Sequence, residues 1–132
     1  MDKLDELFML QKEFDSYLEE NRNISGISLD EWVQKGVIAL IAELIEVVNE
    51  VNYKWWKNPF EIDKSKLKEE MIDVLHFYIS TCMKIGITPD EVLELYKAKT
   101  TENKLRQMGL SDKKGYALSE YVNTDKQGEC DE

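Results

Sequence analysis

The sequence predicts an all-α protein, a bundle of four to five helices. Apolar residues recur at helical spacing in four segments, capping residues stand at the segment ends, and no segment alternates apolar and polar residues as a strand would. The chain has 132 residues, 42% of them hydrophobic, which is enough for one domain with a core. We expect this domain at residues 1–116, and a polar, flexible tail at 117–132.

The first two helices are predicted from an amphipathic stripe and a cap. Apolar residues at helical spacing place the first helix at residues 3–20. Ser28 and Glu31 form a capping box at the start of the second helix, which we expect to run to about Lys54.

The last two helices are bounded by turn-forming residues. We expect the third helix to start near Asp63 or Ser65 and to end at Gly86, a residue suited to a left-handed stop. A second capping box carries Pro89 in its first turn, where the missing backbone donor costs nothing. The fourth helix then ends at Gly109.

The charge and the cysteines limit the functions to consider. A net charge of −10 argues against nucleic acid or an anionic membrane as a partner, and it would repel a polyphosphate unless metal ions reversed the local sign. Cys82 and Cys130 lack metal-ligand spacing, and a disulfide framework is not expected. Because the chain shows no apolar run of a signal peptide or membrane span, we expect a cytoplasmic protein.

Two acidic pairs are the most informative motif. Glu43 and Glu46 form the first pair, and Glu70 and Asp73 the second, each as acid-x-x-acid within an apolar helical stretch. Residues three apart lie on one side of a helix, so two facing helices would bring four carboxylates together. Such acids repel unless cations fill the site, and all-oxygen ligands suit Mg²⁺. The pairs therefore predict a Mg²⁺ site for polyphosphate chemistry.

Other readings of these acids stay open. A single acid-x-x-acid pair is usually solvated surface, but the apolar residues around both pairs favour a functional role. Glu50 falls near the Glu43–Glu46 face and is either an outer ligand or exposed. His76 lies off the second face and is interpreted as an ordinary helix histidine.

Polar residues on the first and fourth helices are further candidates. Gln11 sits on the apolar stripe of the first helix, where either a ligand's base or the backbone could satisfy its amide. Lys99 and Arg106 share a stripe of the fourth helix with Tyr96 and Asn103, and this stripe is either a phosphate clamp or a solvated face.

Trp55 and Trp56 follow the second helix. Aromatic residues in this position serve in the core, in a dimer contact or as a wall against a nucleobase, and the sequence does not choose among these roles.

Together the motifs resemble the dimeric all-α dUTPases, which belong to the MazG-like nucleotide pyrophosphatases. The resemblance covers residues 4–116. It rests on the opening Leu10-Gln11 and on four motifs: Glu43-Leu-x-Glu46-x-x-Asn49-Glu50, Lys54-x-Trp56, Glu69-Glu70-x-x-Asp73-x-Leu75-His76-Phe77 and Tyr96-x-x-Lys99-x-x-x-Asn103-x-x-Arg106-Gln107.

The resemblance implies a role for each candidate residue. The Mg²⁺ ligands would be Glu43, Glu46, Glu70 and Asp73, and Glu43 or Glu46 would help to activate water. The phosphate contacts would be Lys99 and Arg106, and the uracil nucleoside would be held by Gln11, Trp56 and Asn103. Tyr116, after Gly115, would contact a phosphate or the sugar.

The expected activity is Mg²⁺-dependent hydrolysis of dUTP to dUMP and pyrophosphate. A short chain of helices leaves its carboxylate face hard to cover, so we expect a homodimer with its sites near the interface. Two alternatives remain: a broader MazG-type pyrophosphatase acting on dCTP or damaged nucleotides, and a non-catalytic helical module that binds divalent ions.

Overall fold

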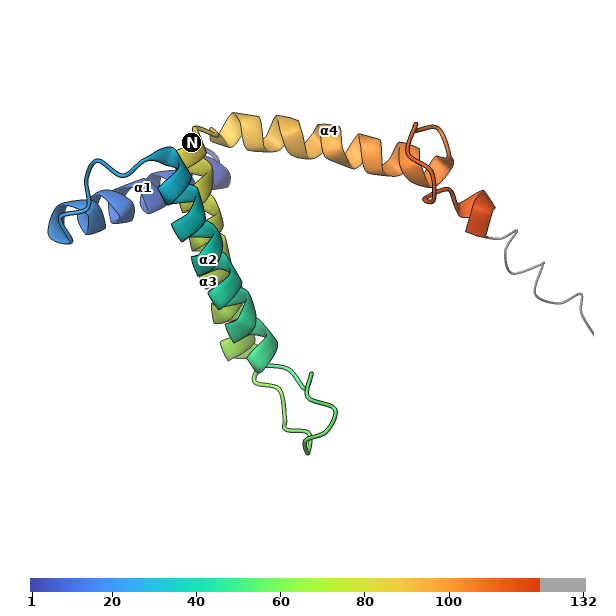
Figure 1. The fold of residues 1–132 in the computed structure, drawn as a ribbon, viewed down its shortest axis with the longest axis horizontal. Coiled ribbons are helices and arrows are strands. Elements are labelled where there is room, and N and C mark those ends of the chain that lie inside the picture. The colour runs from blue at the N-terminus through green and yellow to red at the C-terminus, as the bar shows by residue number, and fades with distance from the viewer. Residues whose placement is uncertain (122–132) are drawn as a thin grey trace, which may run out of the picture. The chain divides into compact units, whose positions relative to one another are not determined.

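Four long α-helices make up most of the protein. The structure is a computed structural model that describes residues 1–121 (Figure 1). Its long helices are α1 (Lys3–Asn21), α2 (Leu29–Asn49), α3 (Lys64–Ile85) and α4 (Pro89–Met108), and residues 118–121 are also helical. The all-α prediction is confirmed, since residues 1–121 contain no strand. Most of the predicted tail, and Cys130 with it, lies outside the described residues.

Side-chain caps start two of the helices where the sequence predicts them. The Ser28 hydroxyl accepts a hydrogen bond of 3.2 Å from the Glu31 backbone N–H at the start of α2. The Asp63 carboxylate accepts bonds of 3.0 and 3.2 Å from the backbone N–H groups of Ser65 and Lys66 at the start of α3. These bonds satisfy donors that a helix leaves unpaired in its first turn.

Glycines end α3 and α4 as predicted. Gly86 and Gly109 have φ angles of +90° and +75°. Residues with a Cβ rarely adopt this left-handed region, so both positions favour glycine at the helix end. Pro89 then begins α4 directly after the turn.

The second helix is shorter than predicted. It ends at Asn49, with Glu50 as its C-cap, rather than near Lys54. The reason is a loop closed by one side chain: the Asn52 amide donates 2.9 Å to the Phe60 carbonyl and accepts 2.9 Å from the Phe60 N–H. The Asn52 side chain thereby holds residues 52–60 in a loop, and the backbone leaves the helix through bonds from the Glu50 N–H to the Val47 carbonyl and from the Val51 N–H to the Val48 carbonyl.

Residues 1–89 form one compact unit, in which α2 and α3 pack side by side and α1 packs against α3 (Figure 1). Gly36 on α2 meets Thr81 on α3 at a close approach, because a Cβ added at Gly36 would lie 2.3 Å from the Thr81 hydroxyl oxygen. Phe8 on α1 and Ile79 and Cys82 on α3 are the buried apolar side chains of this unit.

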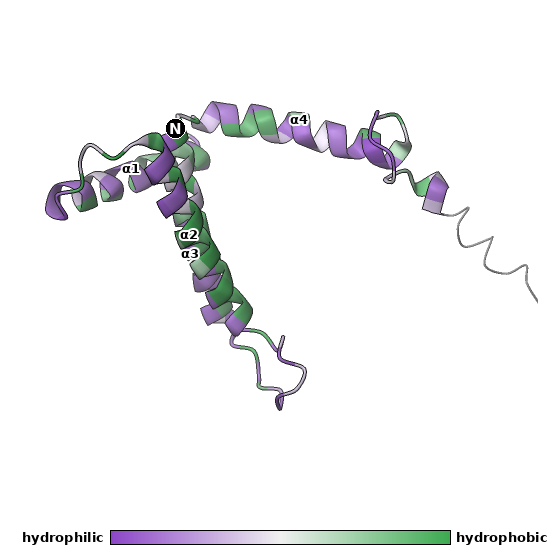
Figure 2. Ribbon diagram, viewed as in Figure 1, coloured by the Kyte–Doolittle hydropathy of each residue, from purple (hydrophilic) through white to green (hydrophobic). Residues whose placement is uncertain are grey.

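Much of the apolar surface of α2 is not covered within one chain. None of its residues is buried, and Figure 2 shows the helix green along much of its length. The apolar residues around the two acid pairs do not bury them: Glu43 and Glu70 are half-buried, and Glu46 and Asp73 are exposed. An exposed stripe runs along one side of α2 and consists of Val37, Ile41, Leu44, Ile45 and Val48, which are between 41% and 54% exposed.

The second unit begins at Asp90 and is described to residue 121. After α4 the chain turns at Gly109 and packs Ala117 against it, where a Cβ added at Gly109 would lie 3.2 Å from that of Ala117. In residues 1–121, none of the helices combines the length and apolar character that a membrane span requires.

Candidate active site

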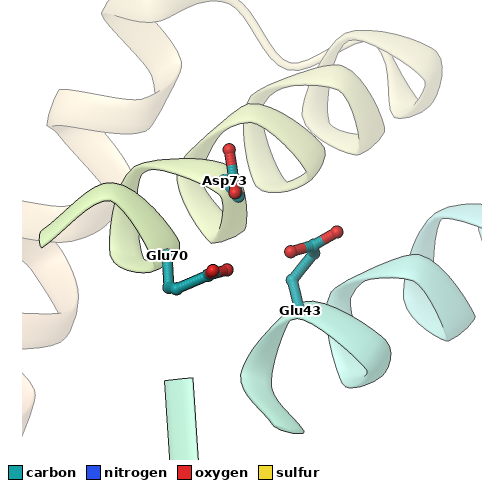
Figure 3. A group of neighbouring side chains, drawn as sticks. All are labelled: Glu43, Glu70 and Asp73. Atoms are coloured by element: carbon teal, nitrogen blue, oxygen red, sulfur yellow. The ribbon is translucent and has the colours of Figure 1, made fainter. Parts of the chain in front are cut away.

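Three carboxylates converge between α2 and α3. Glu43 comes from α2, and Glu70 and Asp73 come from successive turns of α3 (Figure 3). One oxygen from each lies within 4.8 Å of the others. The convergence follows from the packing, because the side of α3 that carries Glu70 and Asp73 faces the side of α2 that carries Glu43. Oxygens this close can share one cation.

The electrostatics of Glu70 show that negative charge dominates the cluster. Partial burial raises the pKa of the Glu70 carboxyl above its ordinary value. The negative charges of four neighbouring acids raise it further, and these are Asp73, Glu46, Glu43 and Glu50. A raised pKa means that the ionised form is held against repulsion, and a bound divalent cation removes that repulsion. The residues present therefore fit a hard metal ion.

Glu46 lies beside this group rather than within it. Its side chain is exposed on α2, and it acts on Glu70 through its charge. Its role as a metal ligand stays a prediction.

One cation stands at the edge of the acidic group. Lys66 on α3 pairs with Glu50 at the end of α2, with 3.2 Å between Nζ and Oε1. The hydrogen bond and charge of Glu50 raise the pKa of Lys66, which keeps the ammonium charged. Glu50 is thus held by Lys66. Lys66 lies one helical turn before Glu70 on α3.

Gln11 is buried, as its place on the apolar stripe predicts, and it is only 8% exposed. Its partner is a side chain rather than the backbone. The Gln11 amide nitrogen donates 2.9 Å to one oxygen of Asp15, and the Ser80 hydroxyl of α3 donates 2.7 Å to the other.

The tryptophans and the histidine are exposed. Trp55 and Trp56 are 87% and 61% exposed, and their rings meet edge to face with centroids 5.7 Å apart. A core role for these rings is excluded within one chain, whereas a dimer contact and a nucleobase wall remain. His76 is also exposed on α3, outside the group of converging acids.

The second unit holds the remaining candidates. Lys99 and Asn103 are exposed on α4. Arg106 donates from Nε to Glu102 at 3.2 Å, and its guanidinium carbon lies 5.6 Å from the centre of the Tyr116 ring. Glu102 also accepts 2.8 Å from the Ser111 hydroxyl, and these bonds lower the pKa of its carboxyl. Arg106 and Tyr116 are therefore brought together.

Comparison with known protein families decides the assignment. Residues 3–108 match the family described as dUTPase, which is most of the 132-residue chain. The chain belongs to this family. As a dUTPase it is an enzyme that hydrolyses dUTP, so the dUTP hydrolysis predicted from the motifs is confirmed. No curated protein and no solved structure was found to match the chain.

Membership in a dUTPase family implies a divalent metal ion, and the converging carboxylates offer it a site. Three functional neighbours were not predicted from sequence: Asp15, Lys66 and Glu102. Asp15 and Glu102 stand four residues from Gln11 and from Arg106, a spacing that brings side chains into contact on a helix. That spacing is the signal that could have found them.

Proposed function

We propose that this dUTPase works with Mg²⁺ held by Glu43, Glu70 and Asp73, with Glu46 as a further ligand. The observation that carries the proposal is the approach of three carboxylate oxygens to within 4.8 Å. All-oxygen ligands suit Mg²⁺, which binds through a few carboxylates together with substrate phosphates. When bound, the ion supplies positive charge for the phosphate oxygens and lowers the pKa of water.

The carboxylates of α2 also act on water. Glu43 or Glu46 orients the attacking water molecule and accepts its proton, as general bases do. The bond between the α- and β-phosphates is then cleaved, giving dUMP and pyrophosphate. Glu70 and Asp73 bind the ion from α3, which faces α2.

The proposal also assigns the substrate contacts. Arg106 binds phosphate through its terminal nitrogens, since Glu102 holds Nε, and Lys99 adds a second charge. Tyr116 packs under Arg106 and contacts a phosphate or the sugar. The uracil nucleoside is held by Gln11, Trp56 and Asn103.

A substrate panel tests the assignment. Pyrophosphate release should be far faster from dUTP than from dCTP, dTTP or UTP, and it should require Mg²⁺. Equal kcat/KM for dUTP and dCTP would contradict the uracil site and favour a broader pyrophosphatase.

We also propose that two copies of the chain pair through the exposed stripe of α2. The stripe consists of five apolar side chains that are 41% to 54% exposed, and contiguous apolar surface of this kind marks an interface. It shares α2 with Glu43 and Glu46, so pairing would put the sites next to the interface.

Light scattering on the purified protein tests the pairing. Wild type should have the mass of two chains, and Ile41→Glu should give single chains. Leu95→Glu, at a 57% exposed position of α4, is the matched control and should leave the mass unchanged. A wild type that is monomeric at micromolar concentration would refute the pairing.

A further inference from the structure

Three side chains link α1 to α3 in a short hydrogen-bonded chain. Gln11 donates to Asp15, which also accepts from Ser80, so both carboxylate oxygens of Asp15 are engaged. The bonds are 2.9 and 2.7 Å long. Because Ser80 belongs to a different helix, the position of Asp15 is fixed from two sides.

This arrangement fixes the orientation of the Gln11 amide. An ionised carboxylate only accepts hydrogen bonds, so it takes an N–H of the amide and repels the amide oxygen. The carbonyl oxygen of Gln11 is therefore held on the side away from Asp15. Among residues 1–121 no buried side-chain oxygen or nitrogen lacks a partner. The Gln11 oxygen receives no protein donor there, so solvent or a ligand can reach it.

The hydrogen-bonded side chains of Gln11, Asp15 and Ser80 meet α3 on the side that carries the acids. Ser80 follows Asp73 by seven residues, which is about 10 Å along the helix and about 20° round it. That separation is comparable with the reach from the phosphates of a nucleotide to the far edge of its base. A substrate with its phosphates at Asp73 can thus bring its base towards Gln11.

We infer that Asp15 is a positioning residue that sets the choice between uracil and cytosine. The inference rests on the proposed placement of Gln11 at the base. Uracil presents a donor at N3 and an acceptor at O4, whereas cytosine presents an acceptor at N3 and a donor at N4. A glutamine amide complements either edge, but only in opposite orientations. By allowing one orientation, Asp15 makes Gln11 selective for uracil.

The isosteric change Asp15→Asn tests this inference. An asparagine can accept from Gln11 or donate to it, and Ser80 can serve either arrangement, so the amide becomes free to turn. The ratio of kcat/KM for dUTP over dCTP should then fall by roughly tenfold or more, with a gain for dCTP. Glu13→Gln, on the exposed side of α1, is the control and should keep the wild-type ratio.

The double variant separates positioning from a structural role. In a Gln11→Leu background, Asp15→Asn should leave the ratio unchanged, because no amide remains to be oriented. A role in folding alone would lower kcat/KM for both nucleotides equally, and that result would overturn the inference.

The single variants distinguish the two levels of the proposal. If Gln11→Leu alters the ratio and Asp15→Asn does not, only the positioning role is wrong. If Gln11→Leu leaves the ratio unchanged, the placement of Gln11 at the base is wrong, and the inference falls with it. The stabilisation of each variant by Mg²⁺, measured without nucleotide, should match that of wild type.

Discussion

Glu43 and Glu70 lie 27 positions apart in the chain and on different helices, yet their carboxylate oxygens approach within 4.8 Å of each other. Two like charges at this separation destabilise the metal-free fold unless one is protonated or a cation lies between them. The pH and metal dependence of stability therefore report directly on this pair.

The first prediction concerns pH. The pKa of Glu70 is raised in the folded protein above its ordinary value of 4.5. At a pH between the pKa of the unfolded state and that of the folded state, the folded protein therefore binds the proton more readily than the unfolded chain does. Stability from this group consequently rises as pH falls through that window. In EDTA, Glu70→Gln should melt higher than wild type at pH 7.5, and the difference should shrink at pH 4.5. A difference that grows at low pH would contradict the repulsion.

The second prediction concerns Lys66. Its ion pair with Glu50 places a positive charge beside the acids, and Lys66 is 58% exposed. Lys66→Met should change stability by about 1 kcal/mol or less. It should also tighten Mg²⁺ binding at low salt, because the site becomes more negative. Titration calorimetry against Lys68→Met, a nearby exposed lysine, provides the comparison. Weaker Mg²⁺ binding would argue against this role.

The third prediction concerns the contact of α2 with α3. A methyl group at Gly36 would lie 2.3 Å from the Thr81 hydroxyl oxygen and 3.3 Å from the Thr81 Cβ. Gly36→Ala should therefore destabilise the protein by about 1–3 kcal/mol in urea denaturation, despite alanine's better helix propensity. Combining it with Thr81→Ala should recover much of the loss, since the crowded hydroxyl is removed. A stabilising single change would mean that the helices do not approach so closely.

The helices were predictable because their signals are local. Ser28, Asp63, Gly86 and Pro89 mark boundaries through their own backbone chemistry, and the structure places them at helix ends as expected. The end of α2 was not predictable, since it depends on Asn52 pairing with Phe60 eight residues away.

The site was predictable in part for the same reason. The spacing of each acid pair shows which residues share a helix face, but not how two helices are rotated against each other. That rotation brings Glu43, Glu70 and Asp73 together and leaves Glu46 beside them. The contact of Asp15 with Ser80 joins residues 65 positions apart, and no local pattern reveals it.

The fourth prediction concerns Mg²⁺ and folding. An ion that binds only the folded state stabilises it by about 2.7 kcal/mol at a hundredfold excess over its dissociation constant. Mg²⁺ without nucleotide should therefore raise the melting temperature of wild type and have little effect on Asp73→Asn. A melting temperature of wild type that does not respond to Mg²⁺ would count against convergence of the acids.

The last prediction tests the central claim, that the converging carboxylates hold the metal for dUTP hydrolysis. The measurement is pyrophosphate release from dUTP, with and without Mg²⁺, for wild type, Glu46→Gln, Asp73→Asn and the control Glu69→Gln on the adjacent face of α3. Wild type and Glu69→Gln should turn over dUTP only with Mg²⁺. Glu46→Gln and Asp73→Asn should lose about a hundredfold or more in kcat while remaining folded. Turnover near the wild-type rate in Asp73→Asn, or undiminished turnover in EDTA, would contradict the account.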